Sequence, residues 1–190
     1  SCLSPQGVTE AAFKAPTSTE LAHDFLWRVE QCVPAKGQIA IFNRSHYEDI
    51  IAVRVKKIFP DPVWKRRYKH VLDFESMLAE EGTVIIKLFL NISKEEQKKR
   101  LESRLQDPDK LWKFCMDDLD DRNRWDEFQT AYQDLIEKTS TPEAPWYIIP
   151  ADRKWYRNLV VARLMVEKLR HLQLSLPTPN FDPASIIIPD

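Results

Sequence analysis

The chain has 190 residues, of which 43% are hydrophobic and 30% charged, and its formal net charge at pH 7 is -1. This length and balance fit one soluble domain with a sizeable core, and they exclude a chain that is disordered overall. The near-zero charge also argues against a general nucleic-acid-binding protein, so a polyanionic partner would require a local patch of positive charge.

Short apolar segments alternate with helical patterns along the chain. Three segments are rich in Ile, Val or aromatic residues and are followed by polar residues, which predicts buried strands over 38–42, 83–92 and 146–150. The segment 8–13 is a less regular fourth candidate, because Glu10 and the alanines beside it interrupt the apolar pattern.

The first helical pattern has an apolar residue at every fourth position: Leu21, Phe25, Val29 and Val33. Thr17 and Glu20 have the spacing of a capping box at its start. We therefore expect one amphipathic helix between the candidate strand 8–13 and the strand predicted over 38–42.

The later helical patterns follow the second and third predicted strands. Ser93 and Glu96 repeat the capping-box spacing and start a predicted helix over 94–105, which Asp107-Pro108 ends. Further helices are predicted over about 119–138 and about 155–172. Strands that alternate with helices predict a parallel sheet with helices on both faces, followed by an irregular, proline-rich tail over 177–190.

Polar residues follow the predicted strands, at the edge of a parallel sheet where ligands bind. These residues are Lys14, Asn43 to Asp49, Asn91, and Asp152 to Arg157. In the segment after Phe42, Arg44 offers a fork of donors that suits phosphate, while Glu48 and Asp49 suit a metal bound directly or through water. The alternative is that these residues cap a helix and form surface salt bridges.

Basic residues gather between positions 54 and 70, where Asp61 is the single acidic residue. They are Arg54, Lys56, Lys57, Lys65, Arg66, Arg67 and Lys69. Such a tract suits an extended polyanion held through many phosphate contacts. The alternative, a solvated face, is favoured by the charge pattern alone. The interleaved Trp64 and Tyr68 fit a core position as well as they fit a ligand contact.

A second basic set lies on the predicted helix 94–105 and in the loop after it: Arg100, Arg104, Lys110 and Lys113. Arg100 and Arg104 share one helix face. A lid that closes cations over a transferring phosphate needs such an arrangement. The alternative is an exposed helix that exchanges salt bridges with its neighbours, among them the acidic segment 117–121.

The glycines and histidines exclude several classes of site. With only three glycines, at 7, 37 and 82, the sequence contains neither a G-x-x-x-x-G-K-[ST] loop nor a Rossmann fingerprint. The four histidines lack zinc-ligand spacing, and no Ser lies in a glycine-flanked nucleophile elbow. Metal-dependent and serine hydrolases are therefore poor interpretations.

The cysteines and apolar runs give expectations about location. Cys2, Cys32 and Cys115 have neither metal-ligand spacing nor an even count, which favours reduced thiols inside the cell. The apolar run 84–90 is too short to span a bilayer, and no signal-peptide pattern opens the chain. We expect a cytoplasmic protein with no membrane partner. The opening segment 1–7 has the composition of a loop joined to an upstream part of the protein, so we expect this chain to be a fragment.

Several stretches together carry a specific resemblance, foremost Phe-Asn-Arg-Ser-His-Tyr-Glu-Asp at 42–49. The others are 5–7, 13–17, 23–28, 92–97, 107–108, 112–114, 139–141, 144–147, 149–152 and 154–159. Through residue 176 the chain resembles the second polyphosphate kinase family, which has a P-loop kinase fold related to thymidylate kinases. That family moves phosphoryl groups between inorganic polyphosphate and nucleotides.

The resemblance implies roles for the candidate residues. Asn43, Arg44, Glu48 and Asp49 would form the Walker B end of the site and position phosphate and Mg²⁺. A lid over about 100–122 would stabilise charge on the moving phosphate through Arg100, Arg104, Lys110, Lys113 and Arg122. The form of the 43–49 segment is similar to the branch that acts on AMP and ADP, with ATP as a further nucleotide partner. A homo-oligomer, dimer or tetramer, is also implied.

This sequence departs from the family pattern at its start. Family members carry a strand and a Gly-x-Asp-x-x-Gly-Lys loop upstream of the Pro-Gln-Gly segment 5–7, and neither is present here. We therefore expect a three-layer α/β fold, with a parallel sheet that lacks the first strand and the P-loop and has exposed strand edges. We also expect the chain to be inactive by itself. Two alternatives are a non-catalytic binding remnant and an ATP-dependent nucleoside-monophosphate kinase, although the basic tract fits the latter poorly.

Overall fold

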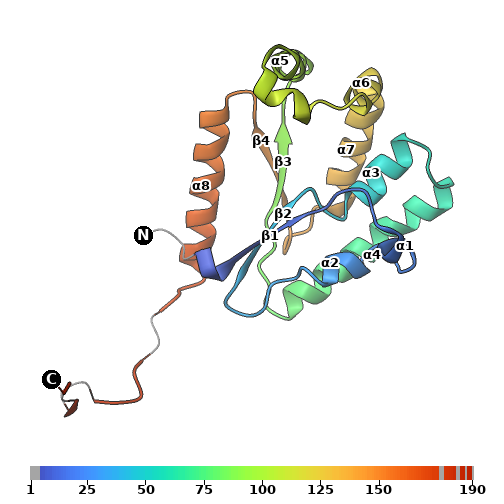
Figure 1. Cartoon of the computed structure of the whole chain (residues 1–190). Coiled ribbons are helices and arrows are strands. Elements are labelled where there is room, and N and C mark those ends of the chain that lie inside the picture. Colours follow the sequence, from blue (N-terminus) through green and yellow to red (C-terminus); the bar gives the residue numbers. More distant parts are fainter. Residues whose placement is uncertain (1–4, 176–177, 183–184, 187, 190) are drawn as a thin grey trace. The chain divides into compact units, whose positions relative to one another are not determined.

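The computed structural model describes residues 5–175, 178–182, 185–186 and 188–189 of the chain. The elements in chain order are η1 (Pro5–Gly7), β1 (Val8–Ala12), α1 (Ser18–Leu21), α2 (Trp27–Glu30), β2 (Ile39–Asn43), α3 (Glu48–Val55), α4 (Asp61–Glu80), β3 (Lys87–Asn91), α5 (Lys94–Gln106), η2 (Pro108–Lys113), α6 (Asp117–Asn123), α7 (Trp125–Thr139), β4 (Trp146–Pro150) and α8 (Lys154–His171) (Figure 1). Among these residues, no helix combines the length and the apolar composition that a membrane crossing needs.

The described residues form two compact units, one within 1–89 and 93–148 and the other within 90–92 and 149–190. In the first unit β1 and β2 are parallel neighbours, with Val8 opposite Ile39 and Ala12 opposite Asn43. β3 and β4 form a second two-stranded sheet. The predicted α/β class with parallel strands is confirmed. The single sheet that we predicted is instead divided, because among the described residues no ladder of backbone hydrogen bonds joins the two pairs.

The helix predicted to run past Leu21 and Phe25 is wrong, since the structure has the two short helices α1 and α2 in its place. The capping box at the start of α1 is confirmed, with both Thr17 and Glu20 side chains bonded to the other residue's backbone. The helical pattern is interrupted at Asp24, whose carboxylate accepts hydrogen bonds from the backbone amides of Leu26 and Trp27, at 2.9 and 3.1 Å. This local competition restarts the helix one turn later.

The helix predicted over 119–138 is likewise divided, into α6 and α7, at Arg124. The Arg124 guanidinium donates to the carbonyl oxygen of Val55, the last residue of α3, at 2.8 Å. A long-range cap of this kind satisfies a carbonyl that the end of α3 leaves without a helical partner. Sequence periodicity contains no information about that contact.

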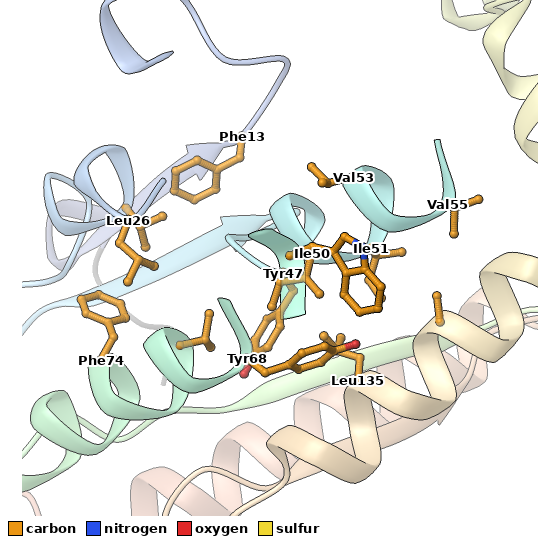
Figure 2. Packing of buried hydrophobic residues seen from close by; sticks show 14 residues of the cluster. Phe13, Leu26, Tyr47, Ile50, Ile51, Val53, Val55, Tyr68, Phe74 and Leu135 are labelled. Atoms are coloured by element: carbon orange, nitrogen blue, oxygen red, sulfur yellow. The ribbon is translucent and has the colours of Figure 1, made fainter. Parts of the chain in front are cut away.

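A hydrophobic core in the first unit joins α3, α4 and α7 (Figure 2). Ile50, Ile51, Val71 and Leu135 are almost wholly inaccessible. The 20-residue α4 was not predicted as a helix, since its first half reads as a basic tract. Its apolar stripe includes Trp64 and Tyr68, which are buried as the core interpretation of that tract expected.

The boundaries of α5 agree closely with the prediction, whereas the strand predicted over 83–92 is shorter in the structure and begins at Lys87. Ser93 caps α5 by accepting from the amide of Glu96 at 3.1 Å, and the helix ends where Asp107 begins the 3₁₀ turn η2. The irregular tail predicted over 177–190 lies only partly within the described residues, since 177, 183–184, 187 and 190 are outside them. Cys2 and the first four residues of the predicted opening loop are outside them as well.

An ion pair between α3 and α7 provides a test of the packing. Arg54 lies 2.6 Å from the carboxylate of Asp134, and both side chains are partly exposed. The hydrogen bond from Arg54 lowers the pKa of the Asp134 carboxyl, against a smaller effect of burial. We expect Asp134→Asn to lower the free energy of unfolding by about 0.5 to 1 kcal/mol at pH 7.

The pH dependence of this loss follows from the lowered pKa. Stability from the Asp134 carboxylate is present above its unfolded-state pKa of about 4 and disappears as pH falls through the lower folded-state value. Urea unfolding at pH 7 and pH 3 measures the difference between wild type and variant. A difference of the same size at both values would show that charge on Asp134 is not its source.

Candidate functional site at the carboxyl end of β2

The candidate site begins where β2 ends and the chain turns toward α3. The amide of Phe13 donates to the carbonyl oxygen of Asn43 at 3.1 Å, so the carboxyl ends of β1 and β2 remain joined one step beyond the strands. Arg44 follows with φ of 63°, in the left-handed region, and is exposed, as is Asn43. This conformation costs a non-glycine residue about 1 to 2 kcal/mol. Strain held at a strand end is typical of functional positions.

Glu48 begins α3 and lies half-buried beside this turn. Burial raises the pKa of the Glu48 carboxyl; the charge of Arg44 opposes that shift, and the carboxylates of Asp49 and Asp121 add to it. A carboxylate whose charged form is disfavoured in this way gains most from a bound cation.

Asp49, the next residue, is engaged by two arginines. Its Oδ2 accepts from Arg28 at 2.9 Å, its carbonyl oxygen accepts from Arg67 at 2.5 Å, and its Oδ1 lies 3.9 Å from Arg67. Arg28 is buried and also donates to the carbonyl oxygen of Lys14, at 2.9 Å. This arginine therefore ties the segment after β1 to the start of α3.

Arg28 was not among the predicted site residues. Two features of the sequence could have indicated it. Arg28 is a cation next to Val29 in an otherwise apolar helical stripe, and it belongs to the segment 23–28 that carries part of the family resemblance. A buried arginine requires acceptors for its donors, and the structure identifies them as Asp49 and the backbone at Lys14. Lys14 itself is exposed.

Glu48 fits a metal ion better than Asp49 does. Mg²⁺ in phosphoryl-transfer sites is held by one or two carboxylates together with substrate phosphates and water. Glu48 is a suitable single carboxylate, whereas the Asp49 carboxylate is already neutralised by Arg28. Within the described part of the chain, no three His, Cys, Asp or Glu residues gather in a metal-binding group. Direct coordination by Asp49 stays a prediction that this ion pair argues against.

The predicted basic tract is largely paired with carboxylates. The pairs are Arg54 with Asp134, Lys56 with Asp121, Lys65 with Asp61, Arg67 with Asp49, and Lys69 with Asp73. Lys57 and Arg66 are exposed and have no ion pair among the described residues. Much of the positive excess read from the sequence is therefore compensated by acidic residues, and four of the five, Asp49, Asp73, Asp121 and Asp134, lie outside the tract.

The predicted lid cations tie α5, η2 and α6 to one another. Arg104 lies 3.0 Å from the Asp118 carboxylate, and Arg122 donates to the Lys94 carbonyl oxygen at 2.7 Å. The other partners are Glu96 for Arg100, Asp107 for Lys110, and the indole ring of Trp112 for Lys113. This arrangement corresponds to the salt-bridge interpretation of the second basic set. A phosphate that binds Arg100, Arg104 or Lys110 must replace a carboxylate.

Parallel strands with intervening helices, and an arginine and a carboxylate at the carboxyl end of β2, are features of α/β proteins of the P-loop kinase-like type. The comparison with known families is more specific. This chain belongs to the polyphosphate kinase 2 family, whose sequence model matches residues 1–176. The resemblance read from the motifs is thereby confirmed.

Individual relatives agree with this assignment. An AMP/ADP-polyphosphate phosphotransferase from Meiothermus ruber is 53% identical over 186 residues, which cover 98% of this chain and 70% of the relative. An ADP-polyphosphate phosphotransferase from Rhodopseudomonas palustris is 39% identical, covering 92% of this chain and 65% of the relative. The crystal structure of Polyphosphate Kinase 2 from Arthrobacter aurescens TC1 superimposes with a TM-score of 0.93 at 50% identity, covering 96% of this chain and 64% of that chain. This chain thus spans about two thirds of the length of these relatives.

Proposed function

We propose that this chain is the greater part of an enzyme that transfers phosphoryl groups between inorganic polyphosphate and AMP or ADP. The observation that carries the proposal is Arg44, an exposed arginine in a strained turn at the carboxyl end of β2, beside the half-buried Glu48. The names of the Meiothermus and Rhodopseudomonas relatives supply the substrates.

The chemistry proposed for this site is in-line transfer without a protein nucleophile. Arg44 presents two parallel donors to phosphate oxygens, and its charge opposes the charge that builds up on the transferring group. Mg²⁺, when bound, would neutralise phosphate oxygens, and Glu48 is the residue that would hold it. Arg100, Arg104 and Arg122 would add positive charge if the segment 100–122 closes over the substrates.

We further propose that transfer requires a phosphate-binding loop that this sequence does not contain. No G-x-x-x-x-G-K-[ST] pattern occurs among the 190 residues. Backbone amides and a lysine of such a loop supply much of the stabilisation in phosphoryl transfer. Asn43, Arg44 and Glu48 would then form one wall of a site whose other wall is supplied from elsewhere.

The test is transfer from polyphosphate to AMP or ADP with Mg²⁺, measured for this chain and for a form extended upstream by a phosphate-binding loop. We expect activity in the extended form and little or none in the chain alone. Polyphosphate or nucleotide binding without transfer in both forms would favour the non-catalytic alternative. Transfer from ATP but not from polyphosphate would favour a nucleoside-monophosphate kinase.

Three expectations stay predictions. They are a homo-oligomeric assembly, a cytoplasmic location, and polyphosphate contacts along the basic tract at Lys56, Lys57, Lys65, Arg66 and Arg67. For the last, Lys57 and Arg66 are the most direct probes, because both are exposed and without ion pairs among the described residues. Transfer from a long polyphosphate donor should be reduced more by substitution of Lys57 and Arg66 than transfer from a short donor, since a long chain contacts more cations.

A further inference from the structure

A buried polar cluster joins four elements of the first unit. Lys87 of β3 is 5% exposed, and its ammonium donates to Glu75 of α4 at 2.7 Å, to the hydroxyl of Tyr47 at 3.1 Å, and to the carbonyl oxygen of Thr139 at the end of α7 at 2.6 Å. An ammonium has three donors, so these acceptors satisfy it completely.

The carboxylate of Glu75 is equally well satisfied. Its second oxygen accepts from the hydroxyl of Tyr47 at 2.6 Å, and the side chain is 4% exposed. Burial raises the pKa of the Glu75 carboxyl, but the nearby imidazole of His46, 3.5 Å away, the hydrogen bonds from Lys87 and Tyr47 and the charge of Lys87 outweigh it, and the net pKa is below its ordinary value. Lys87 and Glu75 therefore form a buried ion pair whose ammonium and carboxylate oxygens all have hydrogen-bond partners.

Tyr47 connects this cluster to the candidate site. It immediately precedes α3 and lies between Arg44 and Glu48 in the chain. Its ring is 5% exposed and packs 4.9 Å from the ring of Trp146, while its hydroxyl is held by both Glu75 and Lys87. Directional bonds at the far end of the ring restrict the rotation and depth of the side chain, which apolar packing alone does less strictly.

Stability alone is a weak explanation for these charges, because a buried ion pair gains little over apolar side chains of the same volume. The directional bonds that the pair makes to Tyr47 suit a role in geometry. The site beside it requires geometry, because Arg44 is held in a left-handed conformation that its own residue type disfavours. Asn43 is held on one side of Arg44 by the amide of Phe13. Tyr47 is held on the other side by Glu75 and Lys87.

We propose that Lys87 and Glu75 are positioning residues for the proposed phosphoryl transfer. Through the hydroxyl of Tyr47 they hold the turn that carries Arg44 and Glu48, without contacting the substrates. This inference rests on the proposed function. Misplacement of a reacting or charge-stabilising group by about 1 Å can cost about 10²-fold in rate.

Tyr47→Phe is the sharpest test, since it removes only the hydroxyl that joins the cluster to the turn. In the extended form we expect kcat to fall about tenfold or more with KM for the nucleotide nearly unchanged. Lys87→Met, which leaves Glu75 unpaired, should have a larger effect on kcat and also lower the melting temperature. Tyr68→Phe is the matched control, because it removes a buried phenol hydroxyl that has no hydrogen-bond partner among the described residues.

Hydrogen exchange of the backbone amides over 44–50 gives a readout that does not depend on activity. Tyr47→Phe and Lys87→Met should speed this exchange, whereas Tyr68→Phe should leave it as in wild type. The inference would be overturned if Tyr47→Phe is folded and has the same kcat and the same amide exchange as wild type. If wild type itself transfers no phosphate, the proposed function fails, and faster exchange in Tyr47→Phe would still show that the cluster fixes the turn. A fall in kcat equal to that of Tyr68→Phe would indicate a general loss of packing and overturn the positioning role.

Discussion

Arg44→Ala is expected to reduce turnover by about 10² to 10³-fold in a form of the protein that contains a phosphate-binding loop. The reason is the loss of a bidentate cation at the carboxyl end of β2, where charge accumulates on the transferring phosphoryl group. Initial rates of polyphosphate-dependent phosphorylation of AMP and ADP measure the effect. Near-normal rates would reject the proposed role of Arg44.

The left-handed conformation of Arg44 allows loss of function to be separated from loss of folding. Glycine adopts a φ of 63° without the penalty that a side chain brings, so Arg44→Gly should be as inactive as Arg44→Ala but more stable by about 1 kcal/mol. Arg44→Lys should retain part of the activity, because it keeps the charge but not the fork. Arg163→Ala, an exposed arginine of α8, serves as the control and should behave as wild type.

Glu48→Gln is expected to lower kcat/KM by roughly 10² to 10³-fold, the equivalent of several kcal/mol of lost metal-dependent stabilisation. Titration with MgCl₂ should show a raised requirement for the ion, since the amide is a poor substitute for the carboxylate. Asp49→Asn is the matched control. It removes the neighbouring carboxylate, which is paired with Arg28, and should lower stability without raising the Mg²⁺ requirement.

The stability of Glu48→Gln should move in the opposite direction from its activity. Burial raises the pKa of Glu48, so the charged carboxylate destabilises the folded state, and this cost develops as pH rises above the unfolded-state value of about 4. The variant lacks this cost and should be more stable than wild type at pH 7 but not at pH 4. Thermal unfolding at both pH values measures it. A less stable variant at pH 7 would show that the Glu48 carboxylate is favourably bonded instead.

The local parts of the fold were predictable because they depend on residues close in sequence. The cap at Thr17, the cap at Ser93 and the end of α5 at Asp107 each involve partners within about one helical turn. The strand over 146–150 has the predicted bounds, since its flanking turn residues limit it on both sides. The segment Asn43 to Asp49 follows β2 as predicted because strand ends are marked by the change from apolar to polar residues.

The pairing of charges was decided by tertiary structure. Composition shows an excess of cations between 54 and 70, but it does not show that α6 and α7 bring Asp121 and Asp134 to them. Arg28 and Asp49 are 21 positions apart, and Lys87 and Thr139 are 52 apart. Local periodicity extends over one helix or strand, whereas these bonds form only when separate elements pack.

The sequence alone therefore determined the family, the α/β class and the position of the 43–49 segment, because motifs and strand ends are local. Only the folded chain decided what each charge in and around that segment does. Asp49 is neutralised by Arg28, Glu48 is left with its charged form disfavoured, and Lys87 is bonded to Tyr47 from within the core. The physical reason is that burial and ion pairing depend on which distant groups surround a side chain after folding.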